Sequence, residues 1–255
     1  MAMPASQTRK LRVNSNGASG REPATIRLRL LNRFELTIDD EPVTLPLTAE
    51  RLVAFLALSA GPTLRSFVAG TLWIDTTEER SNGSLRSALW RLRQCGHDVV
   101  HTGTAHLQLA PSVDVDVHKA VTRSHDLIEG QGSVRGYVDV EELALCSDIL
   151  PDWYDEWVSV ERERFRHLRL HALESLCARF AEAGHYAQAV DAGLLAISAE
   201  PLRESAHRAL IGAYLAEGNF AEALGQFETC RDLLERELGL PPSPKMRTLV
   251  ESITS

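Results

Sequence analysis

The chain has 255 residues, of which 44% are hydrophobic, and a formal net charge of −8 at pH 7. This composition is that of a globular protein, and no stretch reaches the roughly 18 consecutive apolar residues of a membrane span. The polar start has no apolar core and does not predict a signal peptide. The 4 cysteines form no CxxC spacing. We therefore expect a cytoplasmic protein with reduced thiols, no metal, no cofactor and no membrane contact.

The charge is uneven along the chain. Residues 1–110 carry 13 Lys and Arg against 10 Asp and Glu, whereas residues 111–255 carry 14 against 25. A basic first half joined to an acidic second half suggests a nucleic-acid binder attached to an acidic module. The predicted divisions are a disordered basic tail over residues 1–24, a first domain over residues 25–112 and a second over residues 113–255.

The first domain is predicted to begin with strands and to continue with helices. Alternating apolar and polar residues predict an antiparallel sheet with strands at residues 26–31, 34–38 and 43–45. A helix then opens near Thr48, a plausible N-cap, and stops at Gly61-Pro62. The remaining expected elements are a helix over residues 63–73, a polar loop over 74–83, a helix over 84–95 and a β-hairpin around Gly103. This order is that of a winged helix-turn-helix, in which the third helix enters DNA and the hairpin is the wing.

The helix over residues 84–95 has two chemically different faces. A helical wheel at 100° per residue groups its apolar side chains into one stripe: Leu85, Ala88, Leu89 and Leu92. The opposite face carries Arg86, Ser87, Trp90, Arg91 and Arg93, and no acidic residue falls between Arg80 and His97. Solvated helix faces usually mix signs, whereas guanidinium groups attract phosphates and bind guanine in the major groove. The pattern therefore favours DNA contact, and a solvated basic helix is the alternative.

The second domain is predicted to be helical and repetitive. Helices are expected over residues 119–128, 140–145 and 158–183, with a loop over 130–136. The segment AEAGHYAQAV at residues 181–190 then aligns with LAEGNFAEAL at residues 215–224, an offset of 34. This period, with small residues at the helix crossings, is typical of tetratricopeptide repeats. The predicted fold class is therefore mainly α with a small α+β part.

Two further clusters have alternative interpretations. Trp153, Tyr154 and Trp157 are interpreted first as core that joins the early helices to the long helix, and second as a partner-binding hot spot. Asp114 and Asp116 have a spacing that suits a metal if they share a strand face, but an interdomain linker is the preferred interpretation. Because the chain lacks a Gly-rich phosphate loop, a nucleophile elbow and HExxH, we do not expect an enzyme.

Several segments resemble one family of regulators. These are LRLLNRFELTIDDEPVTL, SLRSALWRLR, ILPDWYDEWVSVERERFRHLRLHALESL and LLERELGLPPSPKMRTLV, and they are similar to the Streptomyces antibiotic regulatory proteins. The resemblance spans about Ile26 to Ile253 and implies an OmpR-type winged helix followed by a bacterial transcriptional activation domain. It implies an activator in the bacterial nucleoid that binds direct repeats in double-stranded promoter DNA of antibiotic gene clusters. Two protomers would bind side by side as a homodimer on DNA and recruit RNA polymerase with its principal sigma factor.

The resemblance also implies roles for single residues. Ser87 and Arg91 match groove-facing positions and Arg93 a phosphate contact, with Arg86 as a further contact. In the wing, His106 stands where the family carries an aromatic residue. The remaining expected DNA contacts are Thr48, Arg65, Arg80, Trp90, Thr102 and Thr104. The two wing threonines are equally compatible with a purely structural hairpin.

The loop over residues 74–83 corresponds to a segment that such activators turn towards RNA polymerase. Its acids Asp75, Glu78 and Glu79 are the expected polymerase contacts, and ordinary solvated loop residues are the alternative. Two other functions fit the same build: a scaffold that uses its helical repeats to bind proteins, and a repressor.

Overall fold

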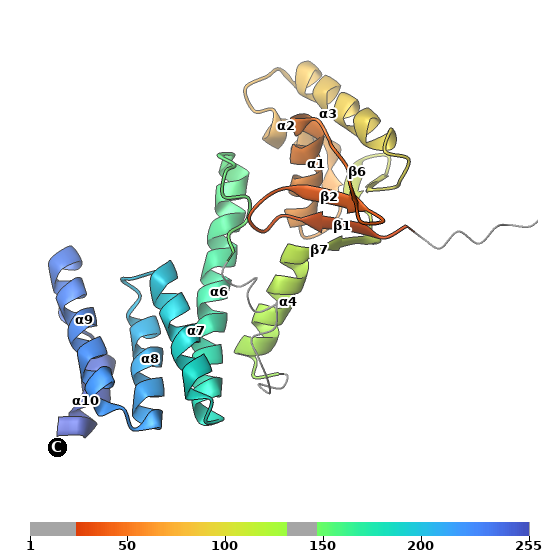
Figure 1. Cartoon of the computed structure of the whole chain (residues 1–255). Helices are drawn as coiled ribbons and strands as arrows, with labels where there is room; N and C mark the ends of the chain where they lie inside the picture. Colours follow the sequence, from red (N-terminus) through yellow and green to blue (C-terminus); the bar gives the residue numbers. More distant parts are fainter. Residues whose placement is uncertain (1–23, 132–146, 255) are drawn as a thin grey trace, which may run out of the picture.

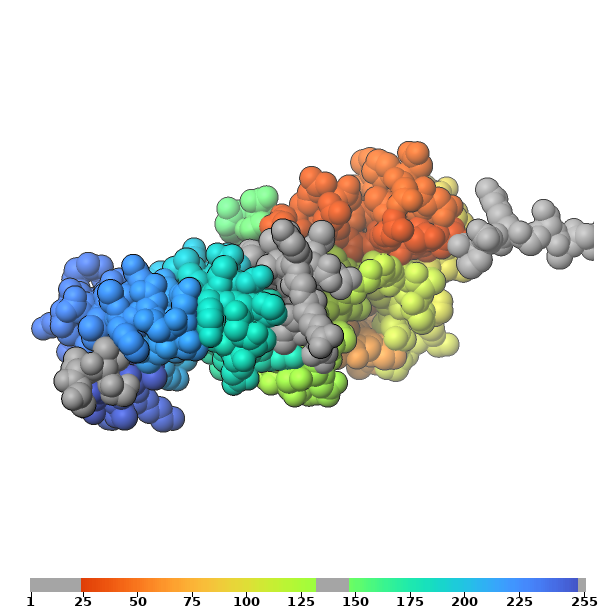
Figure 2. Space-filling model, turned by 60° about the horizontal axis from the view of Figure 1, so that its bottom comes forward, coloured from red at the N-terminus to blue at the C-terminus, as the bar shows by residue number. Residues whose placement is uncertain are grey.

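The computed structural model describes residues 24–131 and 147–254 (Figure 1). The predicted helix over residues 140–145 lies outside these residues, as do nearly all of the predicted tail and most of the loop over 130–136. Figure 2 shows an elongated molecule, with the residues of the first domain at one end and the last helices at the other. No helix among the described residues is both long and apolar enough to cross a membrane.

A four-stranded sheet opens the first domain, and its order is β3-β2-β1-β7. Its strands are β1 Ile26–Arg29, β2 Glu35–Ile38, β3 Glu41–Pro42 and β7 Val113–Val115. In β1 the residues Ile26 and Leu28 are buried while the arginines between them are exposed, as the alternation predicts. The third strand was expected at residues 43–45. It lies earlier because Asp39 and Asp40 adopt positive φ angles of 51° and 66°, a two-residue turn that places Glu41 opposite Ile38.

Strand β7 changes the interpretation of the predicted linker. It pairs in parallel with β1, so the sheet takes one strand from just beyond the domain boundary predicted after residue 112. Asp116 then accepts backbone N–H bonds from Leu30 at 2.9 Å and Leu31 at 3.0 Å, and Asp114 pairs with Lys119 at 2.7 Å. The linker interpretation of both aspartates is therefore wrong. The domain limits themselves stay a prediction.

Three helices and a second sheet complete the winged-helix domain. The bounds are α1 Leu47–Leu58, β4 Thr63–Leu64, α2 Arg65–Leu72, α3 Glu78–Arg93, β5 Val100–Thr102 and β6 His106–Leu109. The second sheet has the order β4-β6-β5, with β5 and β6 forming the predicted hairpin. The three helices followed by this hairpin confirm the predicted winged helix-turn-helix arrangement.

Two helix starts differ from the prediction. Pro46 occupies the N-cap position of α1, so Thr48 lies inside the first turn and is not the cap. Helix α3 begins at Glu78, so most of the loop predicted over residues 74–83 is helical. The run ERSNGS is helical although Ser, Asn and Gly favour loops. Ser81 is buried in this turn, and its hydroxyl donates to the carbonyl of Glu78 at 3.0 Å.

Helices form the second domain, as predicted. Their bounds are α4 Asp116–Ile128, α6 Glu156–Glu182, α7 Tyr186–Ala199, α8 Glu204–Glu217, α9 Phe220–Leu238 and α10 Pro244–Thr254. Helices α6, α7, α8 and α9 lie side by side in a row (Figure 1). The predicted offset is visible in their starts: α7 begins at Tyr186 and α9 at Phe220, each shortly after a glycine with positive φ at Gly184 or Gly218.

The two domains share one hydrophobic core at their junction. Trp157 packs against Phe55 of α1 with ring centroids 5.2 Å apart, and Trp153 stacks on Phe34 at 6.0 Å. This confirms the first interpretation of both tryptophans. Tyr154 differs, because it is 93% exposed and takes no part in the core. The guanidinium of Arg162, in α6, donates to the carbonyls of Ile149 and Trp153, each at 2.9 Å, and to that of Leu150. These bonds hold residues 149–153 against α6.

Candidate nucleic-acid interface

Helix α3 presents the two faces that the helical wheel predicts. Its buried residues include Leu85, Ala88, Leu89 and Leu92, which face the core of the winged helix. Its exposed residues include Arg86, Ser87, Trp90, Arg91 and Arg93, which we call the arginine face. Trp90 is 54% exposed. An exposed tryptophan among cations is unusual on a solvated helix and suits contact with sugars or bases.

The arginines of this face have no carboxylate partner among residues 24–131 and 147–254. Most other described arginines do pair with acids, for example Arg29 with Glu35 at 3.1 Å and Arg203 with Glu174 at 2.6 Å. The guanidinium carbon of Arg91 instead lies 5.0 Å from the ring centroid of Trp90, a cation–π contact that holds its position but leaves its charge unneutralised. The face therefore carries positive charge that is free to meet phosphates or base edges.

The N-terminal end of α3 carries the opposite charge. Glu78 and Glu79 lie in its first turn and are exposed, and Asp75 is exposed in the short segment before it. Arg80 is also exposed and belongs to the helix rather than to a loop. Carboxylates at a helix N-terminus interact favourably with the helix dipole. One helix thus presents an acidic start and a basic second half.

The wing lies next to the start of α2. The backbone N–H of Arg65, the first residue of α2, donates to the carbonyl of Ala105 at 2.9 Å, and Leu64 pairs with His106 across β4 and β6. Arg65 is half-buried there. Thr102, Thr104 and His106 are all exposed on the hairpin. Thr48 is exposed too, but it lies on a separate element, in the first turn of α1.

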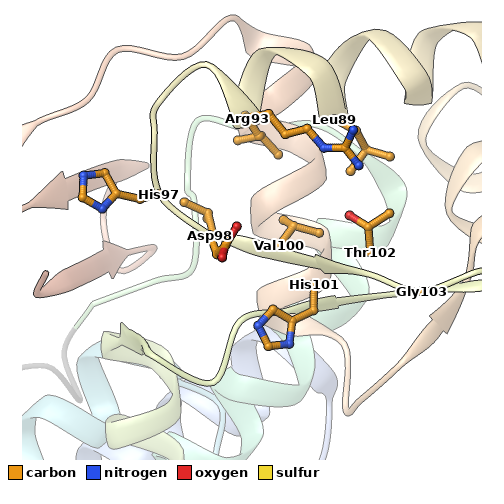
Figure 3. Close-up of a pocket in the computed structure, with 10 residues that line it drawn as sticks. Leu89, Arg93, His97, Asp98, Val100, His101, Thr102 and Gly103 are labelled. Atoms are coloured by element: carbon orange, nitrogen blue, oxygen red, sulfur yellow. The ribbon is translucent and has the colours of Figure 1, made fainter. Parts of the chain in front are cut away.

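A cleft of about 490 Å³ separates the last turns of α3 from the wing. Figure 3 shows Arg93 reaching over this cleft from the helix, with Thr102 on the strand below it. The lining also includes His97, Asp98 and His101. A guanidinium and a hydroxyl on opposite walls are suitable donors for one phosphate group. Arg93 and Thr102 were predicted as contacts from the sequence, whereas the two histidines were not. Their only signal was their place: His97 follows α3 and His101 lies in strand β5 of the hairpin.

Comparisons with known proteins agree with this description. Residues 144–254 match the family model of the bacterial transcriptional activator domain. The described fold therefore joins a winged helix to a helical region that matches the bacterial transcriptional activator domain. The resemblance to the Streptomyces antibiotic regulatory proteins is confirmed by this match and by the relatives that follow.

Two curated relatives share the description "Regulatory protein AfsR". The protein of Streptomyces coelicolor is 26% identical over 253 residues, which cover 92% of this chain and 25% of that protein. The protein of Streptomyces griseus is 34% identical over 93 residues, or 36% of this chain and 10% of that protein. The chain therefore spans at most a quarter of the length of either relative.

One solved structure has the same fold. It is EmbR of Mycobacterium tuberculosis in complex with a low-affinity phosphopeptide, with a TM-score of 0.74 and 20% sequence identity. The similarity covers 91% of this chain and 65% of the EmbR chain. It confirms the predicted fold class, mainly α with a winged-helix part and a helical C-terminal part.

Proposed function

We propose that this chain is a sequence-specific DNA-binding protein that activates transcription, and that it is not an enzyme. The observation that carries the proposal is the arginine face of α3, whose cations have no carboxylate partner among the described residues. The match of residues 144–254 to an activator domain supports the regulatory part of the proposal. The DNA targets that we propose are direct repeats in the promoters of an antibiotic or other secondary-metabolite gene cluster.

The proposed docking places α3 in the major groove. Arg86, Ser87 and Arg91 then face base edges, where a bidentate arginine recognises guanine. Trp90 lies beside Arg91 and would contact a sugar or a thymine methyl group. Arg93 and Thr102 would hold one phosphate in the cleft of Figure 3. This assignment separates residues that read sequence from residues that only position the protein.

Other residues are proposed to contact the DNA backbone from outside the cleft. Arg65 stands at the N-terminus of α2, where the helix dipole also favours an anion. Arg80 extends the positive surface along α3, and Thr104 and His106 belong to the wing. Thr48 lies on α1, apart from α3 and the wing, so its proposed role is limited to a contact with the DNA backbone.

We further propose that the acids at the start of α3 meet RNA polymerase carrying its principal sigma factor. Asp75, Glu78 and Glu79 are exposed, and Arg80 next to them leaves the group net acidic. An acidic surface beside the DNA-contacting face suits a basic surface of the polymerase. Two protomers on adjacent direct repeats would present two such surfaces along one side of the promoter.

In vitro transcription tests this function. The template carries a DNA site that the protein binds, placed upstream of a core promoter, with polymerase and principal sigma factor. We expect more transcript when the protein is added, and no change on a template with a scrambled site. Less transcript on the intact template would identify a repressor of the same build. Unchanged transcript together with tight binding would favour a scaffold.

A further inference from the structure

We propose that a cleft at the junction of the two domains binds a small, neutral, largely apolar molecule that carries a hydrogen-bond donor, such as a phenol. The cleft lies between the C-terminal end of α1, one face of α4 and the first half of α6. Figure 1 shows α4 below α1, with α6 running beside α4 and reaching up to the level of α1. The cleft is separate from the arginine face and shares no residue with it.

The size and walls of the cleft suit a compact ligand. Its volume is about 420 Å³, within the range of roughly 300–1,000 Å³ typical of small-molecule sites, which often lie at domain interfaces. Its walls are mainly apolar and include Ala57 and Leu58 of α1, Val121 of α4, and Phe165 and Leu168 of α6. An apolar ring placed here would be removed from water on three sides, and that burial would supply most of the binding free energy.

The polar groups at the edge of the cleft determine which functional group the ligand needs. The hydroxyl of Ser59 donates to the carbonyl of Phe55 at 2.7 Å, and that of Thr122 donates to the carbonyl of His118 at 3.0 Å. His118 Nε2 lies 2.7 Å from the carbonyl of Ala57, which can only accept, so Nε2 carries the hydrogen.

The hydrogens of these three side chains are therefore already used. What remains at the edge is acceptor capacity: the free lone pairs of both hydroxyls and, in the neutral imidazole, His118 Nδ1. A ligand that only accepts hydrogen bonds would find no matching donor among these three side chains, and Arg164, the cation of the lining, is 73% exposed and paired with Glu161. A ligand with a hydroxyl or amine would donate to one of them, which is why we specify a donor.

The charges at the cleft favour a neutral molecule. Glu161 and Arg164 both line it, and they pair with each other at 2.9 Å. The pair leaves no net charge to attract an ion. Because α1 belongs to the first domain while α4 and α6 belong to the second, the ligand would contact both domains at once. Binding would stabilise the folded junction by mass action.

The test uses two matched probes and the whole chain. 2-Naphthol has an apolar double ring and a hydroxyl donor, whereas 2-methoxynaphthalene has the same ring and no donor. We expect saturating 2-naphthol to raise the melting temperature of the protein by about 2 °C or more. We also expect 2-naphthol to bind about fivefold more tightly than the methoxy compound in a fluorescence titration, the value of one hydrogen bond.

Three variants localise the binding. Val121→Trp fills the cleft from α4 and should weaken 2-naphthol binding about tenfold or more. Val160→Trp adds the same ring on the exposed side of α6 and should leave binding unchanged. Thr122→Val keeps the shape and removes one acceptor, so it should reduce the preference for 2-naphthol over 2-methoxynaphthalene. Because Thr122→Val hardly changes the packing, it remains informative if Val121→Trp folds poorly.

Two results would overturn the binding site, and a third would overturn the donor requirement. One is a wild-type protein whose melting temperature and fluorescence respond to neither compound. The other is binding that is equal in the wild-type protein, Val121→Trp and Thr122→Val, which would place the ligand elsewhere. Equal affinity for the two probes would refute the donor requirement. None of these measurements involves DNA, so their outcome is independent of the proposed function.

Discussion

Each arginine of the α3 face has its own expected role, and the roles can be separated by substitution. We predict that Arg91→Ala weakens specific DNA binding by about 1–3 kcal/mol and relaxes the preference at one base position, because it removes a bidentate base contact. Arg93→Ala should weaken binding to all sequences alike and lower the salt slope by about 1, because it removes a phosphate contact. Fluorescence anisotropy at several salt concentrations measures both effects.

These two variants control for each other, because both remove one exposed arginine from the same helix. If both variants bound like the wild-type protein, α3 would not be the recognition helix. If they lost affinity with the same salt slope and the same base preference, the division between base and phosphate contacts would be wrong.

His207, in α8 of the second domain, links the stability of the fold to pH. His207 is 1% exposed, its Nε2 lies 2.8 Å from the carbonyl of Pro201, and its Nδ1 lies 2.7 Å from the amide nitrogen of Gln226. Burial lowers the pKa of His207, although the Pro201 carbonyl and Glu204 oppose the shift. The unfolded chain therefore binds a proton more readily. As the pH falls below about 6.5, the usual histidine pKa, the free energy of unfolding should decrease.

Urea unfolding at pH 7.5 and pH 5.5 measures this effect of His207. We expect the wild-type protein to lose more stability between these two pH values than a His207→Gln variant, in which the titrating ring is absent. His97, an exposed histidine between α3 and β5, supplies the control His97→Gln, which should keep the wild-type pH dependence. An identical pH dependence in His207→Gln and the wild-type protein would contradict the assignment.

At the scale of elements, the close crossing of α7 and α8 depends on one glycine. A Cβ atom added at Gly193 would lie 3.0 Å from the Cβ of Leu210 and 3.4 Å from the sulfur of Cys177. We predict that Gly193→Ala destabilises the fold by about 1–3 kcal/mol through overpacking, despite the better helix propensity of alanine. Gly225, in α9, has nothing within 4 Å of such an atom. Gly225→Ala should therefore stabilise by roughly 0.5–1 kcal/mol.

Chemical denaturation of both glycine variants tests the crossing. Opposite signs are the expected result. A stabilised Gly193→Ala protein would mean that α7 and α8 lie further apart than described.

The acidic first turn of α3 allows a second prediction at this scale. The double change Glu78→Ala and Glu79→Ala should leave DNA affinity nearly unchanged but reduce transcript in the in vitro assay, because the acids lie in the first turn of α3, at the opposite end from Arg91 and Arg93. Loss of the two charges also removes a favourable dipole interaction of about 0.3–1 kcal/mol each, so the melting temperature must be recorded alongside.

The double change Glu228→Ala and Glu237→Ala on α9 removes the same charge elsewhere and should not affect transcript. Loss of DNA binding would instead place this turn in the DNA interface.

Across the whole molecule, the features that depend on local residue patterns were predicted from the sequence, whereas a feature that depends on pairing between distant strands was not. The faces of α3 follow from residue spacing alone, since Leu85, Leu89 and Leu92 recur at helical intervals. The offset of 34 likewise located the starts of α7 and α9. By contrast, strand β7 was missed, because three residues next to a helix acquire strand structure only by pairing with β1, far away in the sequence.

The start of α3 was missed for a related reason. Ser81, Asn82 and Gly83 favour a loop by propensity, and only their packing in the folded domain makes them helical. For the candidate site, the sequence located the side chains but not the cleft that joins Arg93 to Thr102. That cleft depends on the angle between α3 and the wing, which no local pattern encodes.

The most direct measurement is the recovery of fragmented bacterial genomic DNA by the purified protein at about 150 mM salt, a concentration that suppresses nonspecific phosphate binding. An Arg86→Ala and Arg91→Ala double variant is compared with Arg231→Ala and Arg236→Ala, which removes the same charge from exposed positions on α9. We predict enrichment of a few upstream regions that share a direct repeat, lost in the α3 variant and retained in the α9 variant. Equal recovery by all three proteins, or no enrichment with any of them, would contradict the central claim that the arginine face reads DNA.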